Sequence, residues 1–352
     1  MRPDLAVLGA GPVGIVAALA ASKRGLSIVL SGATPAKTRR ARLELVPVQF
    51  LHVLLELGLR PQDAGWAATC AHRRIAWEAA TPTEQAGASL AVMRRFELEE
   101  ALLNRAARDG RIIFAPDLES PTRTESGWRG RGWQAPRLLD ATGRSATTAM
   151  SLVRWPMVAW HWLAPGGAEP WFGLAAVPAG YVYRCAIPGA DCLGLVQRGS
   201  GARTQKELRA DVLQAGVEWI LEGFNWPSAN ESPPVAAGAQ WTAPQFDDSC
   251  LAVGDARLAR DPLSSQGLLS GVVEALGSLD AWQESPGWAS LLRKRQDENI
   301  HHHRRSLLSY IASCRFRDEP HWRGYSAWLE TPSKSTRPRH PRTDSAAPRR
   351  ST

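Results

Sequence analysis

The hydrophobic pattern of the first 32 residues alternates between short apolar runs and a helical stretch. Residues 5–8 are all apolar, and the alanine-rich stretch that follows a group of glycines predicts a helix. Residues 26–30 are again mostly apolar and predict a second strand. A strand, a helix and a strand in this order are typical of a parallel sheet covered by helices.

Similar signals recur along the chain. They predict a basic loop from Arg39 with an amphipathic helix up to Gly58, a helix over residues 92–106, and strands over residues 111–115, 137–140 and 250–253. The last two strands each end in a turn, Asp140-Ala-Thr-Gly143 and Gly254-Asp255. We expect both turns to lie beneath a nucleotide.

Residues 151–245 have a different pattern, in which tryptophans and short alternating segments replace the alanine-rich helices. Glycine and proline turns separate these segments, so the region predicts a β-rich lobe. Its aromatic residues include Trp155, Trp160, Trp162, Trp171, Tyr181 and Tyr183. A single aromatic residue on a half-buried sheet is usually part of a core, but the cluster as a whole is a candidate binding surface for a flat aromatic substrate.

Length and composition favour one compact unit with two lobes. The chain has 352 residues, of which 44% are hydrophobic, so it can bury a large core. The patterns predict a discontinuous nucleotide-binding domain, residues 1–150 and 246–330, around a substrate lobe, residues 151–245. Residues 331–352 are rich in Pro, Ser and Arg and predict a disordered basic tail.

The net charge of +8 comes mostly from this tail, whose last 20 residues contain six Lys or Arg and one Asp. The rest of the chain is only mildly basic, so we expect no nucleic-acid partner. No stretch of 18 uncharged apolar residues is present to span a bilayer, and the five cysteines include no CxxC pair. The sequence therefore predicts a cytoplasmic protein without a membrane span or a metal site.

The first turn carries the pattern Gly9-x-Gly11-x-x-Gly14 between the predicted strand and helix. Without β-carbons, glycines allow the backbone N–H groups at a helix start to approach a pyrophosphate. Folds of this kind normally place an acidic residue for the ribose hydroxyls at the end of the next strand. This chain has Ser31 there, which carries no charge, so we expect weaker binding of the adenosine end of a dinucleotide.

Four features together resemble the FAD-dependent aromatic hydroxylase superfamily, which has the p-hydroxybenzoate hydroxylase fold and includes the tryptophan halogenases. They are the glycine turn, an arginine before the helix near residue 95, Asp140-Ala-Thr-Gly143, and Leu251-Ala-Val-Gly-Asp255 followed by Asp261-Pro-Leu-Ser-Ser-Gln-Gly267. The tryptophan-rich middle and residues 316–322 are most similar to flavoproteins that modify tryptophan, including those that mature tryptophylquinone enzymes. The resemblance covers residues 4–330. It implies an α/β protein with a Rossmann-like FAD-binding domain of the GR2 type, an inserted β-rich substrate lobe and C-terminal helices.

The same resemblance implies which residues hold FAD. They are Gly9, Gly11, Pro12, Val13 and Gly14 at the diphosphate, Arg42 and either Arg94 or Arg95 at the cofactor, Gly254 and Asp255 at the ribityl chain and diphosphate, and Pro262 to Gly267 beneath the flavin ring. A helix that begins beneath the ring would stabilise the negative charge of reduced flavin. The sequence departs from the family at Ser31, at Ala141 in the Asp-Ala-Thr-Gly turn, and at Arg257, where a histidine is common.

The activity that the resemblance implies is monooxygenation, in which a flavin C4a-hydroperoxide hydroxylates an electron-rich aromatic ring. The expected substrate is an aromatic small molecule or a tryptophan in a protein. A basic group that accepts a phenol or indole proton would help, and His161 and Tyr183 are the candidates. No second GxGxxG pattern is present, so electrons are expected from transiently bound NAD(P)H or from a partner flavin reductase.

Three other functions stay open. A flavin-dependent halogenase would use a lysine before the middle lobe, but no lysine lies between Lys37 and Lys206, and Trp160-His-Trp162 only imitates the halogenase WxWxIP pattern. Ser31 and the compact lobe also fit a degenerate or accessory flavin-binding protein without turnover. An isoprenoid reductase or cyclase shares the glycine and Gly-Asp patterns, and such a reductase would consume no O2.

Overall fold

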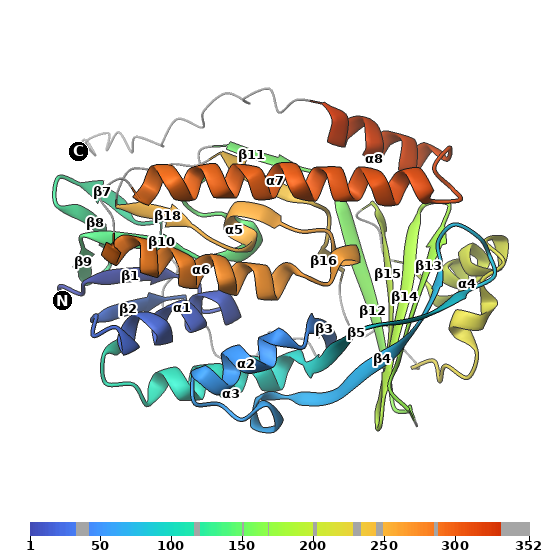
Figure 1. Cartoon of the computed structure of the whole chain (residues 1–352), viewed down its shortest axis with the longest axis horizontal. Coiled ribbons are helices and arrows are strands. Elements are labelled where there is room, and N and C mark those ends of the chain that lie inside the picture. The colour runs from blue at the N-terminus through green and yellow to red at the C-terminus, as the bar shows by residue number, and fades with distance from the viewer. Residues whose placement is uncertain are drawn as a thin grey trace, which may run out of the picture.

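Two sheets that lie next to each other dominate the computed structural model (Figure 1). The structure describes residues 1–32, 42–115, 120–149, 151–167, 169–199, 203–227, 234–243, 249–284 and 288–331. Apart from its first residue, the predicted tail 331–352 lies outside the described residues. Most of the basic loop before Arg42 lies outside them as well.

The first sheet has five strands, all parallel. In order across the sheet they are β18 (Cys250–Ala252), β10 (Arg137–Asp140), β1 (Leu5–Leu8), β2 (Ile28–Ser31) and β6 (Ile112–Ala115). The central strand β1 is buried along its whole length, which its uninterrupted apolar run predicts. The five strands predicted for this region are present, and the predicted α/β class is confirmed.

Helix α1 (Pro12–Lys23) follows β1 and packs against the sheet, α3 (Arg95–Ala107) and α6 (Gly267–Glu284) (Figure 1). Nearly all residues of α1 are buried. Its alanines explain this position, because a helix that is apolar all round can be enclosed by its neighbours. Helix α2 (Gln49–Glu56) ends just before Gly58, as the sequence predicts.

The second sheet, which we call the large sheet, has eight strands. In order they are β16 (Val235–Ala236), β12 (Met157–Ala164), β15 (Ala190–Arg198), β14 (Gly180–Ile187), β13 (Trp171–Val177), β4 (Trp66–Ala76), β5 (Thr83–Arg94) and β3 (Leu43–Pro47). The sequence patterns did not predict the last three. The large sheet therefore takes strands from both sides of residue 150, and the division into two domains stays a prediction.

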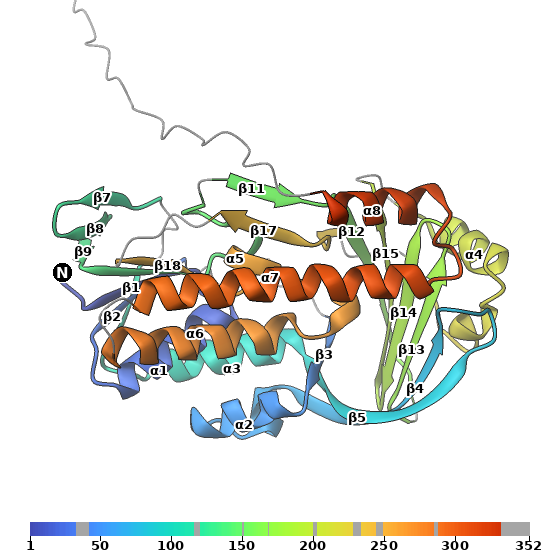
Figure 2. The same cartoon turned by 45° about the horizontal axis from the view of Figure 1, so that its top comes forward.

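Smaller elements complete the described part of the fold. They are β7 (Thr122–Thr124), β8 (Gly127–Gly130), β9 (Trp133–Ala135), β11 (Ser151–Arg154), β17 (Gln240–Ala243), α4 (Gln205–Gln214), α5 (Asp255–Leu258), and the short 3-10 helices η2 (Pro61–Ala64), η3 (Gly143–Ser145), η4 (Glu218–Leu221) and η5 (Pro262–Ser264). The long helix α7 (Trp288–Ser313) runs past both sheets, and α8 (Pro320–Glu330) turns back along it (Figure 2). Among the described residues, no helix combines the length and the apolar character needed to cross a membrane.

Candidate active site

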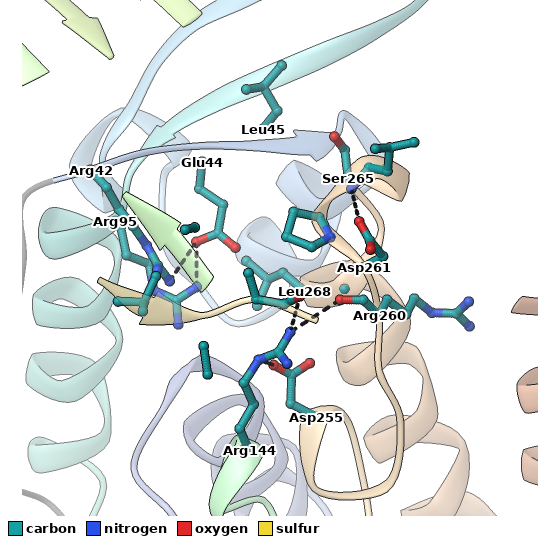
Figure 3. A pocket seen from close by; sticks show the side chains of 18 of the residues that line it. Arg42, Glu44, Leu45, Arg95, Arg144, Asp255, Arg260, Asp261, Ser265 and Leu268 are labelled. Carbon is teal, nitrogen blue, oxygen red and sulfur yellow. Dashed lines mark hydrogen bonds and ion pairs between the residues drawn. The ribbon is translucent and has the colours of Figure 1, made fainter. Parts of the chain in front are cut away.

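Residues of both sheets line one cavity of about 310 Å³. The parallel sheet contributes the β1–α1 turn, the turn after β10 and the start of α5, and the loop before α6 lies beside them. The large sheet contributes side chains from β3, β12, β13 and β14. Figure 3 shows the charged side chains of this cavity, which come from segments far apart in the sequence.

The three glycines of the β1–α1 turn have different surroundings. A β-carbon on Gly9, which has φ of +95°, would lie 2.3 Å from the backbone oxygen of Ala141. A β-carbon on Gly14 would lie 1.9 Å from the backbone oxygen of Gly9. A β-carbon on Gly11 would meet nothing within 4 Å, and Gly11 lines the cavity together with Pro12 and Val13. Gly9 and Gly14 therefore shape the turn, while Gly11 leaves space in the cavity.

The second predicted turn opens on the same cavity. Gly254 has φ of +57° and donates its backbone N–H to Glu274 Oε2 at 2.8 Å, so it supports the turn from behind. Asp255 begins α5 and lines the cavity. Burial raises the pKa of Asp255, and the guanidinium of Arg144, whose Nε lies 3.7 Å from Oδ2, partly opposes this shift. The two turns that lie 240 residues apart in the sequence thus share one cavity.

The loop that follows α5 completes this side of the cavity. Pro262, Ser265 and Gly267 line the cavity, and α6 begins at Gly267. The Asp261 carboxylate accepts a hydrogen bond from the backbone N–H of Leu263 at 3.0 Å and so caps η5. Because α6 is a helix of 18 residues, the partial positive charge of its N-terminus lies at the cavity.

Only one of the paired arginines reaches the cavity. Arg95 lines it together with Arg42, and Arg95 Nη1 lies 2.5 Å from Glu44 Oε2 (Figure 3). Arg94 does not line it, and its half-exposed side chain lies 3.8 Å from Glu97. Burial raises the pKa of Glu44, but the guanidinium groups of Arg95 and Arg42 lower it more, so its net shift is downward and Glu44 stays charged.

One face of the large sheet forms the opposite wall of the cavity. Its lining side chains are Ala159 and His161 on β12, Phe172 and Leu174 on β13, and Tyr181 and Tyr183 on β14. They occupy alternate positions, as side chains on one face of a strand must. His161 Nε2 and Tyr183 Oη lie 2.6 Å apart, so the structure brings the two candidate proton-handling residues into contact. Burial raises the pKa of Tyr183 well above 10, so its hydroxyl stays protonated at neutral pH.

The tryptophans of the middle region lie elsewhere. Trp160 and Trp162 flank His161 on β12 but belong to a separate buried cluster that includes residues of α4. Trp155 stacks on Tyr325 of α8, with ring centroids 5.2 Å apart. These three tryptophans are core residues, and the aromatic wall of the cavity consists of Phe172 and the two tyrosines instead.

Sequence reasoning missed several cavity residues. They are Glu44, Arg144, Phe172 and Arg260. Asp261 was predicted only as part of the loop motif, without a role of its own. Arg144 directly follows the Asp140–Gly143 turn, and its position next to a predicted nucleotide-binding turn could have marked it as a cavity residue. Ser31 does not line the cavity; it is buried, and its backbone oxygen accepts a hydrogen bond from Gly9 N at 2.8 Å.

No protein-family model and no curated protein matches the sequence. Solved structures do match it over nearly its whole length. The peptidyl tryptophan dihydroxylase QhpG, described as essential for tryptophylquinone cofactor biogenesis, is 19% identical with a TM-score of 0.67, over 96% of this chain and 80% of that chain. The flavin-dependent brominase Bmp2 is 15% identical with a TM-score of 0.72, over 94% of this chain and 93% of that chain.

A third structure gives the same result. PqsL, a probable FAD-dependent monooxygenase from Pseudomonas aeruginosa, is 13% identical with a TM-score of 0.70, over 92% of this chain and 99% of that chain. At these identities the similarity concerns the fold, and it confirms the fold that the sequence motifs predict. The chain therefore has the fold shared by the flavin-dependent monooxygenases and halogenases to which it is similar.

Proposed function

We propose that this chain is an FAD-dependent monooxygenase that hydroxylates an electron-rich aromatic ring. The observation that carries the proposal is the shared cavity. The glycine turn, the Asp255 turn and the N-terminus of α6 open on one side of it, and an aromatic sheet face with a His–Tyr pair forms the other. A dinucleotide cofactor would bind at the first side and an aromatic substrate at the second, so the two sides would need to face each other.

The residues present fit an FAD molecule. The space next to Gly11 and the helix start at Pro12 suit a diphosphate, since the backbone there can be approached closely. The N-terminus of α6 at Gly267 suits the part of the flavin ring that becomes negative on reduction. When bound, FAD would supply the chemistry that activates O2 for transfer of one oxygen atom to the substrate.

The protein side of this reaction is positioning and proton transfer. Phe172 and Leu174 offer an apolar surface for a flat ring and exclude water from it. His161, in contact with the protonated Tyr183, is the group proposed to accept the phenol or indole proton of the substrate. Tyr183 fixes the orientation of the imidazole, because its hydroxyl contacts Nε2, and the substrate proton would then enter at Nδ1.

A tryptophan side chain, free or within a protein, is the substrate that we favour in this class. The similarity to a structure named as a peptidyl tryptophan dihydroxylase supports it. The electrons would come from NAD(P)H or from a reductase partner. Separate assays of the same enzyme preparation with a tryptophan-containing peptide and with a free indole show which of the two is the substrate.

Three observations bear on the alternative functions. A halogenase that guides hypohalous acid with a lysine is disfavoured, because none of the described residues that line the cavity is a lysine. An accessory protein without turnover would keep the glycine turn but would not need the His161–Tyr183 pair beside the substrate wall. An isoprenoid reductase or cyclase would need an apolar pocket rather than the charged group of Arg42, Glu44 and Arg95.

The deciding experiment is the absorbance spectrum of the purified chain, before and after reconstitution with FAD. We expect a bound flavin spectrum, followed by O2 uptake and the gain of one or two oxygen atoms by an indole substrate in mass analysis. A colourless chain that FAD cannot reconstitute would contradict flavin binding. A yellow chain that consumes no O2 in the presence of reductant and aromatic substrates would leave the accessory function or the isoprenoid reductase in its place.

A further inference from the structure

The Asp261 side chain lines the cavity and accepts three hydrogen bonds, and only 1% of the residue's surface is exposed. Its Oδ1 accepts a hydrogen bond from the hydroxyl of Tyr181 on β14 at 2.7 Å and from the backbone N–H of Leu263 at 3.0 Å. Its Oδ2 accepts one from the hydroxyl of Tyr325 on α8 at 2.8 Å. One carboxylate therefore joins the large sheet, the C-terminal helix and the cavity loop.

The protonation states suit this arrangement. Burial raises the pKa of Tyr181 and of Tyr325 well above 10, so both hydroxyls are donors at neutral pH. Burial also raises the pKa of Asp261, while its hydrogen bonds oppose the shift. On the backbone side, Asp261 N–H donates to Nε2 of His303 at 3.3 Å, and burial lowers the pKa of His303 to about 3, so this imidazole is a neutral acceptor.

The other hydrogen bonds of the loop that Asp261 begins are local ones. Its backbone oxygen accepts hydrogen bonds from the hydroxyl and the N–H of Ser264, at 3.0 and 3.1 Å. Ser265 then adopts φ of +47°, a conformation that costs a non-glycine residue free energy and needs neighbouring contacts to hold it. Pro262 and Ser265 line the cavity, so the wall there depends on how firmly Asp261 is held.

Helix α8 contributes none of the described residues that line the cavity, yet it is firmly docked. The ring of Tyr325 stacks on Trp155 with an interplanar angle of 7°. Trp322 Nε1 donates to the backbone oxygen of Val177 on β13 at 3.0 Å. Tyr325 therefore has a fixed position from which its hydroxyl reaches Asp261.

We propose that Asp261 is a positioning residue and that α8, through the Tyr325 hydroxyl, holds the loop at residues 261–267 in the shape that the cavity needs. The inference rests on the proposed function only in taking this loop to lie beneath the flavin ring. It makes the C-terminal helix part of the site without any contact to cofactor or substrate.

The test compares Tyr325→Phe with Tyr310→Phe in the purified full-length chain, with and without FAD. Tyr325→Phe removes one hydroxyl and keeps the stacked ring, whereas Tyr310 is 47% exposed on α7 and serves as the matched control. Hydrogen–deuterium exchange of a peptide that spans residues 261–268 should become about tenfold faster in Tyr325→Phe, because one charge-assisted hydrogen bond is lost. Tyr310→Phe should leave this peptide unchanged. Faster exchange confined to α8 would overturn the proposal.

A second variant pair separates this inference from the proposed function. Asp261→Asn should speed exchange of the same peptide, and adding Tyr325→Phe to it should have little further effect, since both act on one contact. Full additivity of the two changes would mean that Tyr325 does not act through Asp261. These exchange measurements need no cofactor, so they stand even if the chain binds no FAD. If FAD binds, its dissociation constant should rise about tenfold in Tyr325→Phe, and an unchanged constant would overturn the role of α8 at the cofactor.

Discussion

At the residue scale, the three glycines of the first turn have two different roles: two of them shape the turn, and the third leaves space for a ligand. Gly9 and Gly14 have no room for a β-carbon, so replacing either would deform the turn itself. Gly11 has ordinary backbone angles, with φ of −77°, and open space in front of it. A side chain at position 11 therefore enters the cavity without disturbing the protein around it.

Gly11→Val should abolish FAD retention while leaving the melting temperature of the cofactor-free chain within a few degrees of the unsubstituted one. The valine methyl groups would occupy the space proposed for the diphosphate. Flavin content after purification and thermal unfolding are the two measurements. Gly277→Val is the matched control, because Gly277 also has open space but lies in α6 away from the cavity. Unchanged flavin content in Gly11→Val would remove the glycine turn from the site.

His161→Gln should lower turnover by about 100- to 10,000-fold, the range for loss of a general base, with little change in FAD affinity. Tyr183→Phe should have a smaller effect, because it keeps the imidazole and removes only the hydroxyl that orients it. Turnover with an indole or phenol substrate, measured from pH 6 to 9, provides the comparison. His52→Gln, at an exposed histidine on α2, is the control. Equal turnover in His161→Gln and the control would assign His161 a structural role.

At the scale of elements, the parallel sheet was predictable and much of the large sheet was not. Most strands of the parallel sheet are short apolar runs, and their length and flanking turn residues favour buried strands. Strands β4 and β5 gave no such signal, because β5 is rich in alanine and polar residues and β4 contains His72, Arg73 and Arg74. Residues with low strand propensity form these strands because their neighbours pair with them.

The candidate site, too, could be predicted only in part from the sequence. The glycine and Gly-Asp turns are local signals, so the sequence predicted them by residue number. The choice between His161 and its neighbours Trp160 and Trp162 depends on which face of β12 meets the cavity. That face depends on strand register, which the sequence does not reveal for a strand buried on both sides. Glu44 is a cavity residue only because β3 joins the large sheet.

A cross-strand contact within the large sheet gives a prediction at this scale. Tyr183 on β14 lies opposite Gly194 on β15, and a β-carbon on Gly194 would lie 2.2 Å from Cζ of the tyrosine ring. Gly194→Ala should therefore push the ring away from His161 and lower turnover to the level of Tyr183→Phe. The double variant should be no slower than either single variant, and Gly110→Ala, at an exposed turn, is the control. A further loss in the double variant would show that Gly194 acts on something other than Tyr183.

At the scale of the whole molecule, the C-terminal helices hold the two sheets together. Helix α7 packs on α6 beside the parallel sheet, and α8 packs on α7 and contacts the large sheet (Figure 2). His321 lies in the first turn of α8, with its ring 5.0 Å from that of Trp322 and 6.4 Å from those of Trp155 and Tyr325. Within the described residues, neither of its ring nitrogens has a hydrogen-bond partner. This imidazole is therefore buried in its neutral form.

His321 should make the stability of the whole protein fall as the pH falls. Burial, with a smaller effect from Arg198, lowers the pKa of His321 to about 4, whereas the unfolded chain has an ordinary pKa of 6.5. The unfolded state therefore binds the proton first. The stability that the neutral form contributes is complete above pH 6.5 and is lost as the pH falls toward 4, with a cost of about 2 kcal/mol by pH 5.

His321→Phe removes the titrating group and keeps a ring in the same aromatic cluster. The free energy of unfolding of this variant should improve relative to the unsubstituted chain by about 2 kcal/mol between pH 7 and pH 5. Buried carboxyls such as Asp261 titrate in both proteins, so the difference between their free energies of unfolding reports the titration of His321 alone. Urea unfolding at pH 7, 6 and 5 measures it, and His302→Phe, at an exposed position on α7, should show no such trend. If the free energies of unfolding of His321→Phe and of the unsubstituted chain differ by the same amount at every pH, the imidazole reaches solvent. Helix α8 would then be docked less tightly than its aromatic contacts indicate.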